Sequence, residues 1–218
     1  MARNFQFSVG EYYHVYNRGV DKRVVFTSDA DKVRFQKLLF LCNSTKIVHL
    51  SELTDQHKGE DIYKLDRETR LVDIGLYAIM DNHFHLLLKE LRENGISLFM
   101  QKLMTAYTMY FNILNDRTGA LFQGRFKAKH VQNDAHLKYL FAYIHLNVRD
   151  LFGSPNIQKI ASYKYSSLAD YLHTNARRSS AVLSLKNFPD YFKTHQDRLD
   201  ELSEWLDYGS EDNFKVEP

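Results

Sequence analysis

Two apolar runs separated by a short polar corner, in the stretch 76–89, constrain the fold of this chain more than any other feature. The corner is Asp81-Asn82, and polar turn residues between two strand-like runs are typical of a β-hairpin. The arms of this hairpin are expected at about 71–80 and 83–90. The sequence therefore predicts a pair of neighbouring strands near the middle of the chain.

Two histidines stand just past the corner, with one phenylalanine between them. Residues two apart on a strand point to the same side, so His83 and His85 would project together while Phe84 faces the opposite side. Side by side, the two imidazoles can hold one divalent ion. The alternative is that both histidines serve packing or are exposed to water.

The order of the other predicted elements indicates the fold class. Apolar spacing, strand formers and capping residues predict two further strands and three helices: a strand at 11–18, a helix at 29–42, a helix at 96–114, a strand at 121–131 and a helix at 135–147. With the hairpin, they give the β-α-β-β-α-β order of a ferredoxin-like antiparallel sheet with helices on one face. The last helix is an addition to that core. The sequence therefore predicts an α+β fold.

The chain length of 218 residues fits one generous domain, or one domain with an appendage. We expect a domain at 1–172, interrupted by an insertion at about 43–70, and an acidic helical C-terminal extension at 173–218. Within these limits, a short helix is expected near 168–172 and an acidic helix around 190–206.

The composition argues against a membrane protein and against a disulfide-bonded protein. No run approaches about eighteen consecutive apolar residues, and the N-terminus lacks the apolar core of a signal peptide. The single cysteine, Cys42, cannot form an internal disulfide. We therefore expect a cytoplasmic protein without a membrane partner.

The formal net charge of +2 hides an uneven distribution. Basic residues dominate between 117 and 149, whereas acidic residues dominate after 186. Alternation along 121–131 would place Arg125, Lys127 and Lys129 on one face of a strand, as a basic stripe. Such a stripe can bind a nucleic-acid backbone, or it can simply be a solvated face.

The helix at 135–147 carries Tyr139, Tyr143 and Asn147, each four residues from the next and therefore on one face. An Asn carboxamide oxygen could join two imidazoles as a metal ligand, and a tyrosine one turn earlier would place its hydroxyl beside a bound phosphate. These groups together suit nucleophilic attack on a phosphodiester. The alternative is that the tyrosines serve only packing.

Several segments resemble, in the same order, a known family of transposases. The segment 80–88 is similar to the HUH motif (His, hydrophobic, His) of the REP-associated tyrosine transposases, which belong to the IS200-like single-tyrosine superfamily. The others are Tyr13-His14-Val15-Tyr16-Asn17-Arg18-Gly19, Leu121-Phe122-Gln123-Gly124-Arg125-Phe126-Lys127-Ala128, Tyr139-Leu140-Phe141-Ala142-Tyr143-Ile144-His145-Leu146-Asn147 and Tyr165-Ser166-Ser167-Leu168-Ala169-Asp170-Tyr171-Leu172. Together the resemblance covers roughly residues 10–172.

The resemblance implies a ferredoxin-like, RRM-like fold and a set of site residues. His83, His85 and Asn147 match the metal-ligand positions of the family. Tyr143 matches the nucleophile, and Tyr139 is a competing candidate one turn away. Family members use a divalent ion, so Mg²⁺ or Mn²⁺ is expected here.

The implied reaction is strand transfer on single-stranded DNA at hairpin-forming elements. The tyrosine attacks a phosphodiester, forms a covalent 5′-phosphotyrosine and releases a 3′-hydroxyl that can later rejoin strands. We expect Arg18, Arg125, Lys127 and Lys129 to contact the DNA backbone, and we favour a monomer over a dimer. Two alternatives stay open: a non-catalytic nucleic-acid-binding protein derived from a transposase, and a hydrolytic phosphodiesterase that forms no covalent adduct.

Overall fold

The computed structural model describes residues 6–46, 61–153, 156–172 and 177–208. Its centre is a four-stranded sheet in the order β2-β3-β1-β4, and every neighbouring pair is antiparallel. The strands are β1 (Tyr12–Arg18), β2 (Val72–Ile79), β3 (His83–Glu90) and β4 (Lys127–His130). This arrangement confirms the predicted ferredoxin-like α+β fold. None of the described helices is long and apolar enough to span a lipid bilayer.

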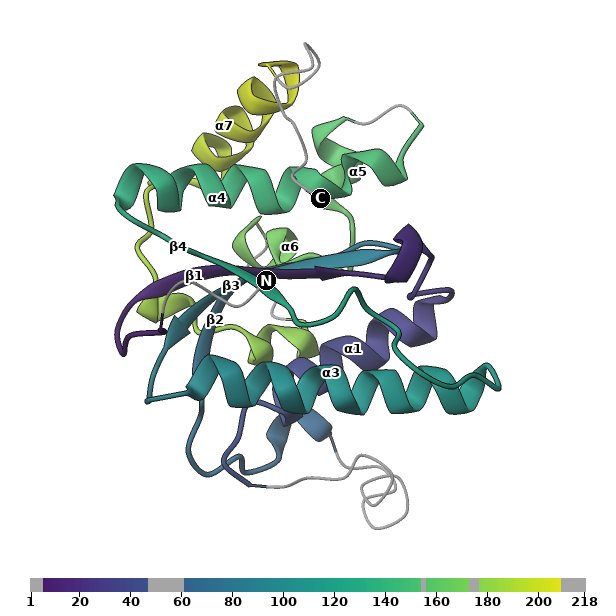
Figure 1. Ribbon diagram of the computed structural model, residues 1–218. Coiled ribbons are helices and arrows are strands. Elements are labelled where there is room, and N and C mark those ends of the chain that lie inside the picture. Colours follow the sequence, from purple (N-terminus) through teal and green to yellow (C-terminus); the bar gives the residue numbers. More distant parts are fainter. Residues whose placement is uncertain (1–5, 47–60, 154–155, 173–176, 209–218) are drawn as a thin grey trace.

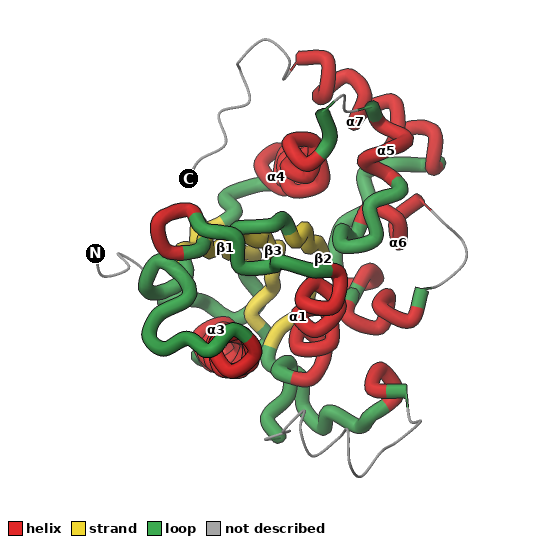
Figure 2. Tube along the Cα trace, turned by 90° about the vertical axis from the view of Figure 1, so that its right-hand side faces the viewer, coloured by secondary structure: helices red, strands yellow, loops and turns green. Residues whose placement is uncertain are grey.

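Helices cover both faces of the sheet, as Figures 1 and 2 show from two sides. One face is covered by α1 (Asp29–Leu41) and α3 (Gly95–Leu114), which are the two helices expected there. The added helix, α4 (Asp134–Leu146), crosses the other face. Around it lie the short helices α5 (Ile157–Ala161) and α6 (Leu168–Leu172) and the longer α7 (His195–Tyr208).

Alternate strand residues build two separate cores. On the α1–α3 side, Val15, Phe84 and Leu86 pack with apolar side chains of those two helices. On the α4 side, Leu76 and Leu87 pack against α4 and the segments beyond it. Because directly paired residues of neighbouring strands share a face, the strand register decides which polar side chains lie under α4.

Local capping explains where the helices begin. The Ser28 hydroxyl accepts a hydrogen bond from the Asp31 amide, and the Asp31 carboxylate accepts one from Ser28, which forms a capping box for α1. At the end of β3 the buried Glu90 carboxylate accepts the Gly95 and Ile96 amides at 3.1 and 2.8 Å. These amides belong to the first turn of α3, so one acidic residue joins the hairpin to the helix that follows it.

The predicted strand at 121–131 is wrong in its first half, because β4 contains only Lys127–His130. Leu121 and Phe122 are both buried, but this part of the chain forms only an isolated bridge, between Phe122 and Gly19. The chain bends there, with Gly124 at a φ of +65°, a left-handed conformation that glycine adopts without strain. Arg125 therefore lies before the strand rather than on it.

The region predicted as an insertion at 43–70 lies partly outside the described residues, since 47–60 are not described. Its described part contains one short 3₁₀ turn, Ile62–Lys64. The acidic helix expected around 190–206 is present as α7, and it begins and ends slightly later than predicted.

The described part of the predicted C-terminal extension packs on both sides of the sheet: residues 178–182 contact α1, and residues 188–208 pack on the α4 side. Leu202 of α7 is fully buried on the α4 side, and Glu201 pairs with Lys138 of α4 at 2.9 Å. The Phe188 ring lies so close to Gly75 of β2 that an added Cβ would approach it to 2.5 Å. The division of the chain at 172/173 stays a prediction.

Candidate active site

The hairpin places both histidines of the HUH-like segment on the sheet face that α4 covers. His83 pairs with Arg18 and His85 pairs with Tyr16 in the register of β1 and β3. The two imidazole rings lie 5.2 Å apart, nearly perpendicular to each other. His85 is buried, and His83 is half-buried. The predicted side-by-side arrangement on one face is therefore present.

The His83 imidazole is oriented by its neighbour in the turn. Its Nδ1 lies 2.6 Å from Oδ1 of Asn82, and Nδ2 of Asn82 donates to the Lys22 carbonyl at 3.0 Å. Because this second bond requires a donor, it fixes which end of the Asn82 amide faces His83. Nδ1 of His83 must then carry the proton, and Nε2 keeps a free lone pair.

His85 has a different partner. Its Nδ1 lies 2.8 Å from Nε2 of His14, a residue of β1. The Nε2 atoms of His83 and His85 are both buried and have no hydrogen-bond partner among the described residues. Each histidine thus uses one ring nitrogen for orientation and keeps the other available.

Helix α4 supplies the other two side chains from its last turn. Asn147, at the C-cap of α4, donates from Nδ2 to the Tyr143 carbonyl at 2.7 Å, while its buried Oδ1 has no partner within the described part of the chain. The Tyr143 ring contacts the His85 ring edge-on at a centroid distance of 5.6 Å. The structure therefore brings together the residues that the sequence singled out from two distant segments.

This group of side chains fits a divalent cation. Two imidazole nitrogens and one amide oxygen are ligands that Mn²⁺ accepts readily and Mg²⁺ accepts less well. The carbonyl end of α4 also favours positive charge at this position. No three His, Cys, Asp or Glu side chains among the described residues form a metal-binding group, so the fit depends on the Asn147 oxygen.

Burial keeps the two histidines neutral, as metal binding requires. It lowers the pKa of His83 to about 4, and the Arg18 charge acts in the same direction. Burial, with the nearby His14 and His83, holds the pKa of His85 well below its ordinary value. Both imidazoles are therefore uncharged at neutral pH and able to donate a lone pair.

The two candidate tyrosines differ in position. Tyr143 is 5% exposed and lies against His85, whereas Tyr139 is 36% exposed and lies between Tyr143 and Trp205 of α7. Burial raises the pKa of the Tyr143 hydroxyl, and hydrogen bonding with the Asn147 side chain partly offsets this effect. The geometry favours Tyr143 as the tyrosine nearer the two histidines.

The four predicted DNA-binding residues do not form one continuous stripe. Lys127 and Lys129 lie on the α4 face, in register with Tyr16 and His14 of β1. Arg18 lies on the same face, close enough for its charge to lower the pKa of His83. Arg125 is exposed in the bend before β4 and does not belong to that strand.

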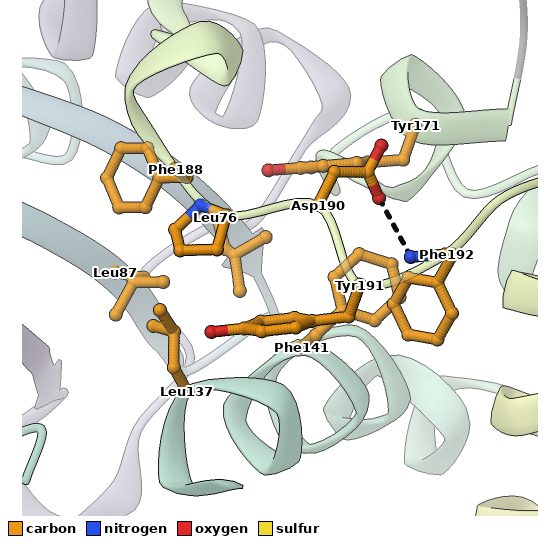
Figure 3. A pocket seen from close by; sticks show the side chains of 10 residues that line it. Leu76, Leu87, Leu137, Phe141, Tyr171, Phe188, Asp190, Tyr191 and Phe192 are labelled. Carbon is orange, nitrogen blue, oxygen red and sulfur yellow. Dashed lines mark hydrogen bonds between the residues drawn. The ribbon is translucent and has the colours of Figure 1, made fainter. Parts of the chain in front are cut away.

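A small apolar pocket lies elsewhere on the α4 side (Figure 3). Leu76 and Leu87 of the sheet form its floor, and α4 and residues 188–192 form its walls. Its volume of about 20 Å³ leaves room for roughly one water molecule, and for no nucleobase. The histidine–tyrosine group is therefore the candidate site, and this pocket is a packing gap.

Two residues that contact the site were not predicted to act in it. The sequence identifies Asn82 only as a turn residue and His14 only as part of a strand motif. Their contacts depend on the Lys22 carbonyl and on the β1–β3 register, neither of which has a local sequence signal. The one hint in the sequence is His14, a polar residue among the strand formers of 12–16.

Comparison with known proteins agrees with the fold and identifies a family. A family model described as "Transposase IS200 like" matches residues 9–147. One similar solved structure, described as a REP-associated tyrosine transposase bound to a REP hairpin, has a TM-score of 0.51 and 13% sequence identity, over 78% of this chain and 83% of that chain. At this identity the likeness shows the fold alone, and no curated protein sequence matches the chain. Since the family model spans well over half of its residues, the chain belongs to the family of IS200-like transposases.

Proposed function

We propose that this protein is a metal-dependent endonuclease and strand transferase that acts on single-stranded, hairpin-forming DNA, with Tyr143 as its nucleophile. The observation that carries this proposal is a group of three buried acceptor atoms, each without a partner among the described residues: His83 Nε2, His85 Nε2 and Asn147 Oδ1. Burying such atoms unpaired is costly, and a bound cation would satisfy all three. Membership of a transposase family supports the same activity.

His83, His85 and Asn147 would hold the ion, either Mg²⁺ or Mn²⁺. When bound, a divalent ion supplies a Lewis acid that polarises a phosphate and offsets its charge. The Tyr143 hydroxyl oxygen then bonds to phosphorus while the bond from phosphorus to the 3′ oxygen breaks. The tyrosine loses its proton, and the released 3′ oxygen gains one.

The product of this step is a 5′-phosphotyrosine on Tyr143 and a free 3′-hydroxyl. Because one phosphate ester is exchanged for another, attack by a 3′-hydroxyl can reverse the step and rejoin strands without ATP. A hydrolytic phosphodiesterase would instead release a free 5′-phosphate. Covalent attachment of the DNA to protein therefore distinguishes the two reactions.

Positive charge on the same sheet face would hold the DNA backbone. Lys127 and Lys129 lie on β4 and Arg18 lies next to His83, so all three can contact phosphates that approach the candidate site. The exposed Arg125 would add a contact from the bend. Hairpin DNA is the proposed partner because the similar solved structure is bound to a REP hairpin. A monomer is the proposed active form.

The test uses labelled single-stranded hairpin DNA, with and without Mn²⁺, on a denaturing gel. Wild type should give a slower, protein-linked band only with metal, and this band should be absent from Tyr143→Phe and from His83→Ala. Tyr139→Phe is the matched control, since it removes the neighbouring hydroxyl and should still form the band. Each variant must unfold at the wild-type temperature for the comparison to hold.

Other outcomes would contradict parts of the proposal. A protein-linked band that persists in Tyr143→Phe but disappears in Tyr139→Phe would move the nucleophile to Tyr139. Cleavage without any linked band would indicate hydrolysis. Tight DNA binding without cleavage would favour a non-catalytic protein derived from a transposase.

A further inference from the structure

The residue that contacts both the predicted metal ligand His85 and the predicted nucleophile Tyr143 is His14, which the proposed reaction does not use. His14 lies on β1 and is 5% exposed. Its ring lies 5.6 Å from the Tyr143 ring in an edge-on contact, and its Nε2 lies 2.8 Å from Nδ1 of His85. A buried polar side chain at this position requires either a structural or a functional explanation.

The His14–His85 contact is a hydrogen bond rather than a stacking interaction. The ring centroids are 5.0 Å apart and the ring planes differ by only 16°, whereas the two nitrogens are 2.8 Å apart. The two nitrogens are therefore much closer to each other than the ring centres are. The two rings lie nearly in one plane and meet edge to edge. This is the geometry in which one imidazole donates an N–H in the plane of the other.

We propose that His14 is a positioning residue that accepts the Nδ1–H of His85 and thereby holds the Nε2 lone pair of His85 toward the cation. This inference rests on the metal site of the proposed function. A metal-ligating histidine commonly donates its other N–H to a carboxylate, a carbonyl or water, which fixes its tautomer and ring orientation. His14 takes the place of that acceptor here.

The surroundings of His14 leave it little freedom to act otherwise. Its ring is held between neighbouring aromatic rings, with Tyr16 at 5.0 Å and Tyr143 at 5.6 Å. With Nε2 as the acceptor, the proton of neutral His14 resides on Nδ1. A carboxylate in this place would add negative charge beside a site that must attract phosphate, and an imidazole adds none.

The test compares two substitutions at one position. His14→Leu fills the space without an acceptor, whereas His14→Gln keeps an amide oxygen that can accept the His85 N–H. Mn²⁺ affinity, measured from the free-ion electron paramagnetic resonance signal, should fall by about 10- to 100-fold in His14→Leu and largely recover in His14→Gln. His130→Gln is the control, since His130 lies on the neighbouring β4 and pairs with the exposed Glu11.

A second readout reports the tautomer directly. Ring ¹⁵N spectra of the metal-free protein should show His85 protonated at Nδ1 in wild type and in His14→Gln, and a mixture of tautomers in His14→Leu. A purely structural role for His14 would change the unfolding temperature without changing this tautomer ratio. Finding His85 protonated at Nε2 in wild type would overturn the inference.

The outcomes separate this inference from the proposed function. If wild type binds Mn²⁺, His83→Ala does not, and folded His14→Leu binds as tightly as wild type, the role of His14 is refuted while the metal site stands. If folded His14→Leu and His14→Gln lose affinity equally, His14 acts through packing and the acceptor role is refuted. If wild type binds no Mn²⁺, the metal site of the proposed function fails, and this inference fails with it.

Discussion

The Asn147 side chain and the Tyr143 main chain are joined by a 2.7 Å hydrogen bond, from Nδ2 of the amide to the carbonyl one turn earlier. This bond uses the donor end of the amide and turns Oδ1 into a buried position with no partner among the described residues. A single residue at the end of α4 thus bonds to the helix terminus and keeps a buried amide oxygen available. The bond therefore joins the proposed nucleophile to the proposed third metal ligand within one helical turn.

Asn147→Ala should therefore lose Mn²⁺ binding. Residues that only orient a ligand change metal affinity by about 10- to 100-fold, so removal of a direct ligand should cost at least as much. Isothermal titration calorimetry with Mn²⁺ measures the change. Asn112→Ala, on α3 at the other face of the sheet, removes a half-buried amide that bonds to the Gly119 carbonyl, and it should bind Mn²⁺ normally. Unchanged Mn²⁺ affinity in Asn147→Ala would remove Asn147 from the ligand set.

The two lysines of β4 should contribute to DNA binding mainly through charge. Lys127→Gln and Lys129→Gln should each weaken hairpin binding and reduce the slope of log K against log salt by about one. Fluorescence anisotropy at several salt concentrations gives both quantities. Lys64→Gln is the matched control, because Lys64 is exposed in a turn near α1, on the other side of the sheet. An equal loss of hairpin affinity in Lys64→Gln would mean that binding depends only on the net charge of the protein.

Asp31 should make stability depend on pH in the acidic range. Its buried carboxylate accepts the Thr27 amide and hydroxyl, the Ser28 amide and the Tyr110 hydroxyl at 2.7–3.0 Å. Burial alone would raise the pKa of Asp31, but these hydrogen bonds outweigh it and hold the pKa below its ordinary value. Since the folded pKa is depressed, the stabilisation is present above about pH 4 and is lost as pH falls further.

Asp31→Asn should accordingly lower the free energy of unfolding at pH 7 by about 1–3 kcal/mol. The difference from wild type should shrink below about pH 4, because Asp31 of the unfolded chain takes up a proton there before Asp31 of the folded protein does. Urea unfolding at pH 7 and pH 3.5 measures both values. Asp200→Asn, an exposed acid on α7, is the control and should show neither effect. A difference that does not depend on pH would contradict the assignment to the carboxylate charge.

The sequence allowed prediction of the parts of the site that follow from short spacings. A two-residue spacing puts His83 and His85 on one strand face, and a four-residue spacing puts Tyr143 and Asn147 on one helix face, so both pairs follow from local geometry. The role of His14 depends on how β1 pairs with β3, which no local pattern encodes. The segment 121–126 was wrongly predicted as a strand because its residue types alternate, although the left-handed conformation of Gly124 bends the chain there.

Gly75 and Phe188 form a contact that links β2 to the C-terminal segment and that was not predicted. A side chain at position 75 would place its Cβ 2.5 Å from the Phe188 ring, so Gly75→Ala should displace this ring and destabilise the fold by about 1–3 kcal/mol. In a Phe188→Ala background the clash is absent. In that background Gly75→Ala should be neutral, or should stabilise the fold by about 0.5–1 kcal/mol, since alanine suits a strand better than glycine. Urea unfolding of the four proteins in this double-mutant cycle measures the coupling. Additive effects would mean that the Phe188 ring does not pack on Gly75 in solution, whereas a reversal of sign would confirm this contact.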